Sequence, residues 1–68
     1  MKIELNGKII CIKNVYTVTD LVKDRNLRPE TIAIEYNGDI INREIWSEVL
    51  LKEKDVIDIV TFMGGGNV

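Results

Sequence analysis

Apolar and polar residues alternate over residues 1–5 of the chain, as they do in a half-buried β-strand. A second apolar run covers residues 8–13, and Asn6-Gly7 lies between the two. Asn-Gly is the strongest short hairpin signal, because both residues tolerate a positive φ. The two-residue turn sets the register and divides the apolar side chains between two faces, with Met1, Ile3, Ile10 and Ile12 on one and Ile9 and Cys11 on the other.

A capping pattern and an apolar stripe predict one short helix after the hairpin. Thr17 and Asp20 have the spacing of a capping box, in which each side chain bonds to the backbone of the other residue. Pro29 disfavours helical geometry at the residue before it, so the helix is expected to end near residue 26 or 27. Helical spacing gathers three apolar side chains on its inner face: Val18, Leu21 and Val22.

Alternation resumes in the second half of the chain and predicts further strands. Residues 31–36 alternate, and Asn37-Gly38 marks a second tight turn before the short apolar pair Ile40-Ile41. The inner side chains of the first of these strands are Ile32, Ile34 and Tyr36. Between residues 42 and 53 no period holds for long, but four apolar side chains are expected to be buried there: Ile45, Trp46, Val49 and Leu50.

The last strand is predicted over residues 56–62, after a turn at Lys54-Asp55. Asp58 is expected to face water, so Ile57 and Ile59 face the core. Alternation puts three apolar side chains on the outer side with Asp58: Val56, Val60 and Phe62. Val60 and Phe62 are either ordinary exposed surface or a docking surface, and their place just before a run of glycines favours docking.

The order hairpin, helix, strand, short strand and final strand predicts an α+β fold. One main helix packs on one face of a mixed sheet of about four to five strands, and the last strand joins the sheet centre beside the first. This is the ubiquitin-like β-grasp arrangement. Residues 1–62 are expected to form the domain, and residues 63–68 a flexible glycine-rich tail.

Composition argues against several classes of function. The chain of 68 residues has a net charge of −2 and scattered basic residues, which gives no electrostatic support for nucleic-acid binding. It has no histidine, and its acidic residues show no spacing typical of a metal or acid–base site, so no metal and no catalytic group of its own is expected. No apolar run approaches the length of about 20 residues that crosses a membrane. The single cysteine, Cys11, is expected to be a small apolar strand residue of a cytoplasmic protein.

Four stretches carry a family pattern in their order and spacing: LNGK at 5–8, TVTDLV at 17–22, YNGDIINREIW at 36–46 and KDVIDIVTFMGGG at 54–66. With these, the chain resembles the small sulfur-carrier proteins of thiamine biosynthesis, relatives of ubiquitin with the β-grasp fold. The most informative parts are Arg43-Glu44-x-Trp46, Asp55 at the strand entry and the glycine run. Asn42 stands where the family usually has proline, a change that a loop can absorb.

The resemblance implies a chemistry centred on the glycines. In the family, an adenylating enzyme uses ATP to activate the terminal carboxylate, and a sulfur-donating enzyme supplies the sulfur of a thiocarboxylate. Thiazole synthase then uses that sulfur. The carrier itself binds no cofactor, because the adenylating partner uses the ATP. By resemblance and position, the residues concerned are Gly66 as the activated glycine, Gly64 and Gly65 as the threading arm, and Val60, Phe62 and Met63 as partner-binding residues.

Other readings of the pattern stay open. A molybdopterin synthase small subunit or a carrier for cysteine synthesis would use the same end in another pathway, although these relatives are usually longer and lack the Arg-Glu-x-Trp element. A β-grasp interaction module or a ubiquitin-like modifier would use the fold without transferring sulfur. Asn67 and Val68 follow the glycines, so the chain is expected to be a precursor that a protease shortens to Gly66, unless the partner tolerates them or they are a cloning remnant.

Overall fold

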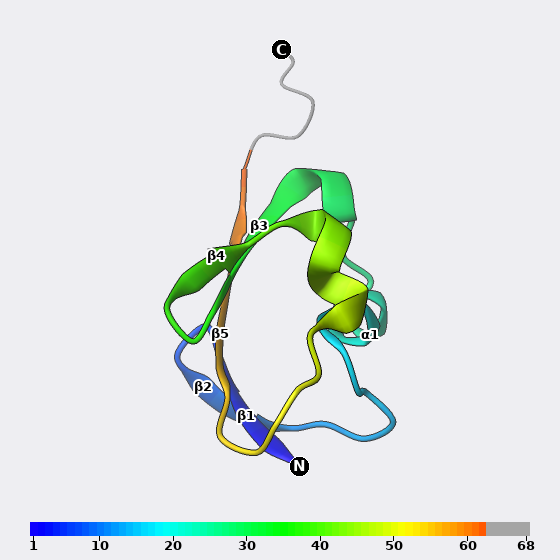
Figure 1. Ribbon diagram of the computed structural model, residues 1–68. Coiled ribbons are helices and arrows are strands. Elements are labelled where there is room, and N and C mark those ends of the chain that lie inside the picture. The colour runs from blue at the N-terminus through cyan, green and yellow to red at the C-terminus, as the bar shows by residue number, and fades with distance from the viewer. Residues whose placement is uncertain (63–68) are drawn as a thin grey trace.

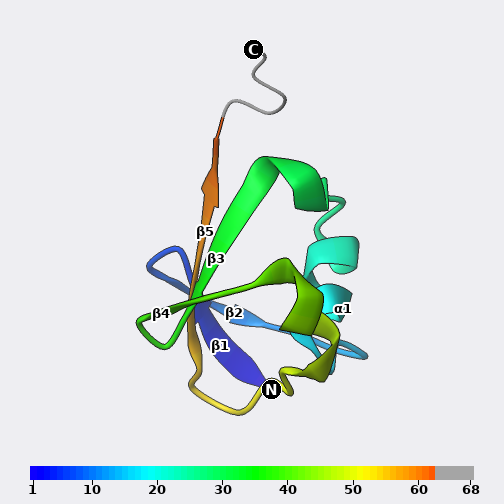
Figure 2. The same cartoon turned by 45° about the horizontal axis from the view of Figure 1, so that its top comes forward.

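Five strands form one mixed sheet in the computed structural model, which describes residues 1–62 (Figure 1). The strands are β1 (Lys2–Leu5), β2 (Lys8–Cys11), β3 (Ile32–Tyr36), β4 (Asp39–Ile41) and β5 (Val56–Thr61). The helices are α1 (Val18–Asp24) and two 3-10 helices, η1 (Pro29–Thr31) and η2 (Arg43–Glu48). Both α1 and η2 lie on the same side of the sheet (Figure 2).

Strand β5 lies at the centre of the sheet, whose order is β2-β1-β5-β3-β4. It runs parallel to β1, with Leu5 beside Ile57, and antiparallel to β3, with Ile34 opposite Ile59. The predicted α+β fold, with the last strand beside the first in a mixed sheet, is therefore confirmed. Because neighbours hold β5 on both edges, the chain leaves the sheet after Thr61 from a fixed position.

Both predicted tight turns are present and need residues that tolerate a positive φ. The angle φ is 50° at Asn6 and 84° at Gly7, and it is 51° and 94° at the equivalent residues of Asn37-Gly38. Positive φ at both central residues matches the right-handed twist of the flanking strands. The register of the first hairpin is confirmed, with Ile3 opposite Ile10 and the Ile12 amide donating to the Met1 carbonyl at 2.9 Å.

Helix α1 begins at the predicted capping box. The Thr17 hydroxyl accepts a hydrogen bond from the Asp20 amide at 3.1 Å, and the Asp20 carboxylate accepts one from the Thr17 amide at 3.1 Å. The helix ends at Asp24, slightly before the predicted end. Asn26 has a φ of 57°, a left-handed conformation that commonly closes helices. This left-handed turn, before Pro29 is reached, ends the helix.

Branched aliphatic side chains and one tryptophan fill the space between the sheet and the helices. Trp46 is 3% exposed, and its indole Nε1 donates a hydrogen bond to the Ile41 carbonyl at 3.3 Å. Trp46 is thus a core residue, and its predicted burial is confirmed. The remaining buried apolar residues are Ile3, Ile12, Val15, Val18, Leu21, Val22, Ile32, Ile34, Leu51 and Ile57.

The structure in and after helix η2 differs from two predictions of burial. Ile45 is 40% exposed and Leu50 is 65% exposed, so both predictions were wrong. A 3-10 helix has about three residues per turn, which places Trp46 and Val49 on the inner side and leaves Ile45 outside. Leu51, which is 6% exposed, fills the core where Leu50 was expected. Neither a strand period nor an α-helical period reveals this spacing.

Strand ends differ slightly from the predicted ranges. Strand β2 stops at Cys11, because the chain then turns toward α1. Thr31 belongs to η1 rather than to β3. Strand β5 stops at Thr61, although the Phe62 amide still donates to the Thr31 carbonyl at 2.9 Å.

Candidate functional site

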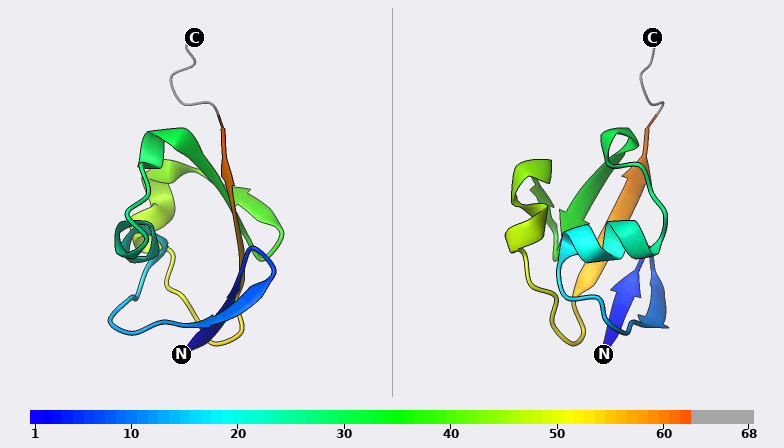
Figure 3. Two further views of the ribbon diagram at one scale, coloured as in Figure 1. Left: turned by 180° about the vertical axis from the view of Figure 1, so that it is seen from behind. Right: turned by 90° about the vertical axis from the view of Figure 1, so that its right-hand side faces the viewer.

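One face of the sheet carries no helix, and we call it the outer face. Helices α1, η1 and η2 all lie on the opposite side (Figure 3). Side chains that alternate with the buried Ile3, Ile34 and Ile57 point to this outer face. The outer face is therefore made of Lys2, Glu4, Ile9, Cys11, Ala33, Glu35, Ile40, Val56, Asp58 and Val60.

Apolar side chains on the outer face are unusually accessible. Ile40 is 72% exposed, Ile9 is 69% exposed and Val60 is 57% exposed. Val60 lies opposite Ala33 in the centre of the sheet, while the two isoleucines lie on the edge strands. The predicted outward orientation of Val60 and the burial of Ile57 are thus confirmed. Apolar surface of this kind on a small domain is typical of a docking surface.

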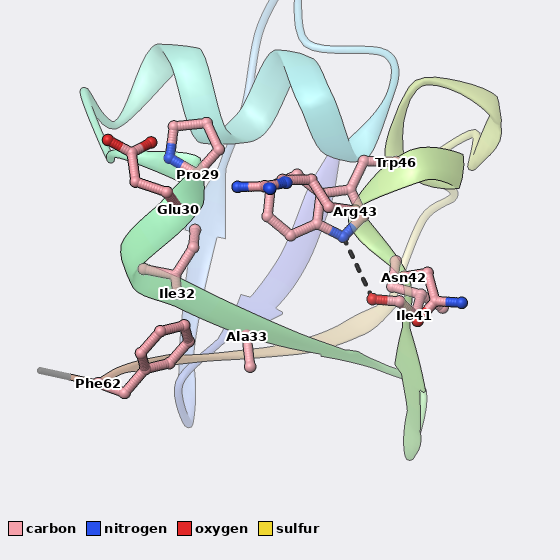
Figure 4. Close-up of a pocket in the computed structure, with 9 residues that line it drawn as sticks. All are labelled: Pro29, Glu30, Ile32, Ala33, Ile41, Asn42, Arg43, Trp46 and Phe62. Carbon is pink, nitrogen blue, oxygen red and sulfur yellow. Dashed lines mark hydrogen bonds between the residues drawn. The ribbon is translucent and has the colours of Figure 1, made fainter. Parts of the chain in front are cut away.

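Phe62 lies where the outer face meets a groove beside the start of β3. Its side chain is 48% exposed, as expected for a residue outside the core. Figure 4 shows it at one end of the groove, with the Arg43 side chain pointing into the groove beside Trp46. The groove has a volume of about 290 Å³ and is lined by Pro29, Glu30, Ile32, Ala33, Ile41, Asn42, Arg43, Trp46 and Phe62. The Arg-Glu-x-Trp element therefore supplies both a core residue and a groove residue.

A hydrogen-bond cluster around Asp55 fixes the start of β5, and sequence reasoning did not predict it. Asp55 is 5% exposed. Its carboxylate accepts hydrogen bonds from the Tyr36 hydroxyl at 2.6 Å, the Lys52 amide at 2.8 Å and Asn37 Nδ2 at 3.2 Å. The Asn37 side-chain oxygen in turn accepts from the Val56 amide at 2.7 Å. An acidic residue directly before a strand was the available signal.

The cluster keeps Asp55 charged. Burial raises the pKa of this carboxyl, but the hydrogen bonds from Tyr36, the Lys52 amide and Asn37 outweigh that effect, so the pKa lies below its usual range. Burial and the bond to Asp55 also raise the pKa of Tyr36. A charged carboxylate held by three donors anchors the second turn to the first residue of β5. The cluster thereby ties the start of the central strand β5 to the turn after β3.

Four of the predicted site residues lie outside the described residues. These are the partner-binding residue Met63, the arm residues Gly64 and Gly65, and the activated glycine Gly66. The last described residue is Phe62, and the central strand β5 brings the chain to it (Figure 1). Of the predicted partner-binding residues, Val60 and Phe62 are accessible at this end of the sheet.

Residues 1–62 contain no group of three or more His, Cys, Asp or Glu side chains that could hold a metal ion. Among the helices of the same part, none is long and apolar enough to span a membrane. Cys11 is a free thiol exposed on the outer face, beside Lys2 of the neighbouring strand.

Known proteins similar to this chain match nearly all of its length. The sulfur carrier protein ThiS of Bacillus subtilis is 40% identical over 65 residues, which are 94% of this chain and 98% of that protein. The solved structure of a thiamine biosynthesis protein (ThiS) from Geobacter metallireducens has a TM-score of 0.83 at 29% identity, and the match covers 97% of this chain and 100% of that one.

A thiazole synthase of Magnetococcus marinus contains a similar region. It is 36% identical over 66 residues, which are 97% of this chain but only 20% of that protein. The model of the ThiS family matches residues 3–66, from the first strand to the third consecutive glycine. Sequence, fold and length agree, and the chain belongs to the ThiS family.

Proposed function

We propose that this protein is a sulfur carrier of thiamine biosynthesis, and that it carries the sulfur as a thiocarboxylate on Gly66. The observation that supports this most is the family match over residues 3–66, which reaches Gly66 itself. The fold supports the same reading, because the central strand β5 directs the chain out of the sheet just before the glycines.

The chemistry follows from a glycine carboxylate and needs no catalytic group of the carrier. A terminal carboxylate has a pKa of about 3.5, so it is ionised at neutral pH and can attack the α-phosphorus of ATP. Pyrophosphate leaves, and the product is an acyl adenylate on Gly66. Hydrosulfide delivered by the donating enzyme then attacks the acyl carbon, and AMP leaves as the acyl–oxygen bond breaks. The product is the thiocarboxylate, and no atom changes its oxidation state.

Glycine suits this end of the chain for a steric reason. It has no side chain to block a narrow channel, and it accepts a wide range of φ. Gly64 and Gly65 would let Gly66 reach a buried active site while the domain stays outside. Ordering them costs about 1–2 kcal/mol per residue, which contacts elsewhere on the carrier must offset.

The outer face is the surface proposed to provide those contacts. Val60 and Phe62 lie nearest to the arm along the chain, and both side chains are exposed. Met63 is proposed to extend the same contact toward the glycines. An adenylating enzyme, a sulfur-donating enzyme and a thiazole synthase are the proposed partners. The carrier-like region within the Magnetococcus protein supports the last of these, because it suggests that the two activities work together.

A direct reaction tests the proposal. A form ending at Gly66 is incubated with ATP and the purified adenylating enzyme of the same organism, and pyrophosphate release is measured. Adding the sulfur donor should then convert the protein to a species in which one oxygen is replaced by sulfur, detected by intact mass. A form ending at Gly65 is the matched control. Equal reaction of both forms, or of neither, would contradict the role of Gly66.

A further inference from the structure

Two acidic side chains lie directly opposite each other at the centre of the outer face. Glu35 on β3 is the cross-strand partner of Asp58 on β5. Glu4 on β1 lies on the other side of β5, beside Val56, which precedes Asp58 on the same face. All three side chains are half-buried. We call Glu4, Asp58 and Glu35 the acidic row.

The acidic row is unfavourable for the isolated domain. Like charges directly opposite each other on neighbouring antiparallel strands destabilise a sheet. Within residues 1–62, the ion pair found within 4 Å joins Arg28 and Glu30, so no lysine or arginine of this part lies within ion-pairing distance of Glu35 or Asp58. Residue pairs that destabilise a sheet tend to occur at functional surfaces.

Apolar side chains lie at both ends of the acidic row. Glu4 pairs with Ile9 on the edge strand β2, and Glu35 pairs with Ile40 on the edge strand β4. Val60 lies next to the row on β5. A set of half-buried carboxylates surrounded by exposed apolar side chains is complementary to a partner surface with an apolar rim and a basic centre.

We infer that the acidic row receives an arginine side chain of the docked partner, placed between Glu35 and Asp58. A guanidinium group has a planar fork of donors that bonds carboxylates in pairs, and it is weakly hydrated, so it suits a half-buried site better than an ammonium group. This inference rests on the proposed function, because it assumes that the outer face docks a partner. It adds the chemistry of that partner: apolar, with arginine at its centre.

Removing the charges of Glu35 and Asp58 tests whether these side chains serve partner binding or the stability of the fold. Glu35→Gln with Asp58→Asn should raise the melting temperature of the free domain by a few degrees, because the like-charge repulsion disappears. The same double variant should bind the purified adenylating enzyme or thiazole synthase of the same organism about tenfold more weakly. Binding of the unchanged protein should weaken between about 0.05 and 0.5 M salt, and binding of the double variant should respond less. Glu48→Gln, which removes one exposed carboxylate from η2, is the matched control and should change neither property.

Val60→Ala distinguishes the failure of this inference from the failure of docking itself. If Val60→Ala weakens binding to a partner but the double variant binds both partners normally, the arginine is absent and the inference is overturned. If neither variant weakens binding to either partner, the outer face is not the docking surface, and that part of the proposed function fails as well. A double variant that self-associates while binding normally would mean that the acidic row only keeps copies of this chain apart.

Discussion

Side chains on β5 alternate between the core and the outer face of the sheet. Ile57 is fully buried and contacts the core under α1, whereas Val60 is 57% exposed on the outer face. Alternation along the strand divides the two roles, so one strand both closes the core and presents the proposed docking surface. Substitutions on β5 can therefore be sorted by parity into those that affect folding and those that affect binding.

Ile57→Ala and Val60→Ala should separate folding from binding. Ile57→Ala should lower the free energy of unfolding by about 2–5 kcal/mol, because it leaves a cavity beside fully buried neighbours. Val60→Ala should change it by less than about 0.5 kcal/mol, since an exposed side chain loses little burial, and should instead weaken partner binding. Urea unfolding and a binding titration give the two measurements. A Val60→Ala protein that unfolds early yet binds normally would reverse the assignment of faces.

Asp55 should make stability depend on pH in the acidic range. Folding lowers the pKa of this carboxyl through its three hydrogen bonds. It therefore stabilises the fold above the pKa of the unfolded chain, about 3.9, and this contribution is lost as the pH falls through the lower folded value. Asp55→Asn should lower the free energy of unfolding by about 1–3 kcal/mol at neutral pH and flatten its decline in acid.

The exposed carboxylate of Asp24 at the end of α1 provides the control for Asp55. Asp24→Asn should leave both the neutral stability and its acid decline close to those of the unchanged protein. Stability is measured by urea unfolding from neutral pH down to about pH 3, which spans the carboxyl titration. An Asp55→Asn protein with the same steep decline in acid would show that other carboxylates govern this range.

Among the elements, the short helix η2 contributes to both the core and the groove. It closes the core with Trp46, directs Arg43 into the groove beside Phe62 and leaves Ile45 in solvent. The indole bond to the Ile41 carbonyl also ties η2 to the edge strand β4. One short helix thus supports both the core and the rim of the groove, where the chain leaves the sheet.

Trp46→Ala should destabilise the domain far more than Ile45→Ala. The tryptophan fills the core and satisfies a carbonyl, so its loss should cost about 3–5 kcal/mol. The neighbouring isoleucine is 40% exposed, so its truncation should cost less than about 1 kcal/mol. Thermal and urea unfolding of the two variants compare adjacent positions of one element. Similar losses for both would mean that η2 does not have the 3-10 spacing described.

At the scale of the whole molecule, the side of the sheet that the helices cover and the open outer face have different roles. Helices α1 and η2 cover one side of the sheet and make the domain stable, while the outer side stays open (Figure 3). The central strand β5 has one face in the core and the other on the open side, and it brings the chain to Phe62. Under the proposed function, a partner holds the domain through the outer face while the glycines enter its active site.

A protein that carries Asn67 and Val68 should react poorly with the adenylating enzyme. Its carboxylate would lie two residues beyond Gly66, about 7 Å further along an extended chain. A channel shaped for glycine would also have to admit a branched valine with a restricted rotamer. Forms ending at Gly66 and at Val68 are compared by ATP-dependent pyrophosphate release, and the mature end is determined by intact mass of the protein from its native cells. A thiocarboxylate found on Val68 would contradict this expectation.

Local sequence determined most of the elements. Asn6-Gly7 and Asn37-Gly38 fixed the two turns because few other pairs adopt positive φ at both positions. The Thr17–Asp20 capping box fixed the start of α1, and strict alternation fixed which side of β5 is buried. These features depend on residues that are close together in the chain, so they can be predicted from the sequence. The resemblance to thiamine sulfur carriers came from the same local stretches.

Tertiary structure decided what depends on residues far apart in the chain. The burial of Asp55 needs Tyr36 and Asn37 from another turn, and the pairing of Glu35 with Asp58 appears only once β3 and β5 meet. Leu50 is exposed because its neighbour Leu51 fills the core instead. Only the packing of the whole domain selects between these two adjacent leucines. Periodicity describes which side of an element a residue occupies, but contacts across the sheet set the charge and hydrogen-bond partners that it meets there.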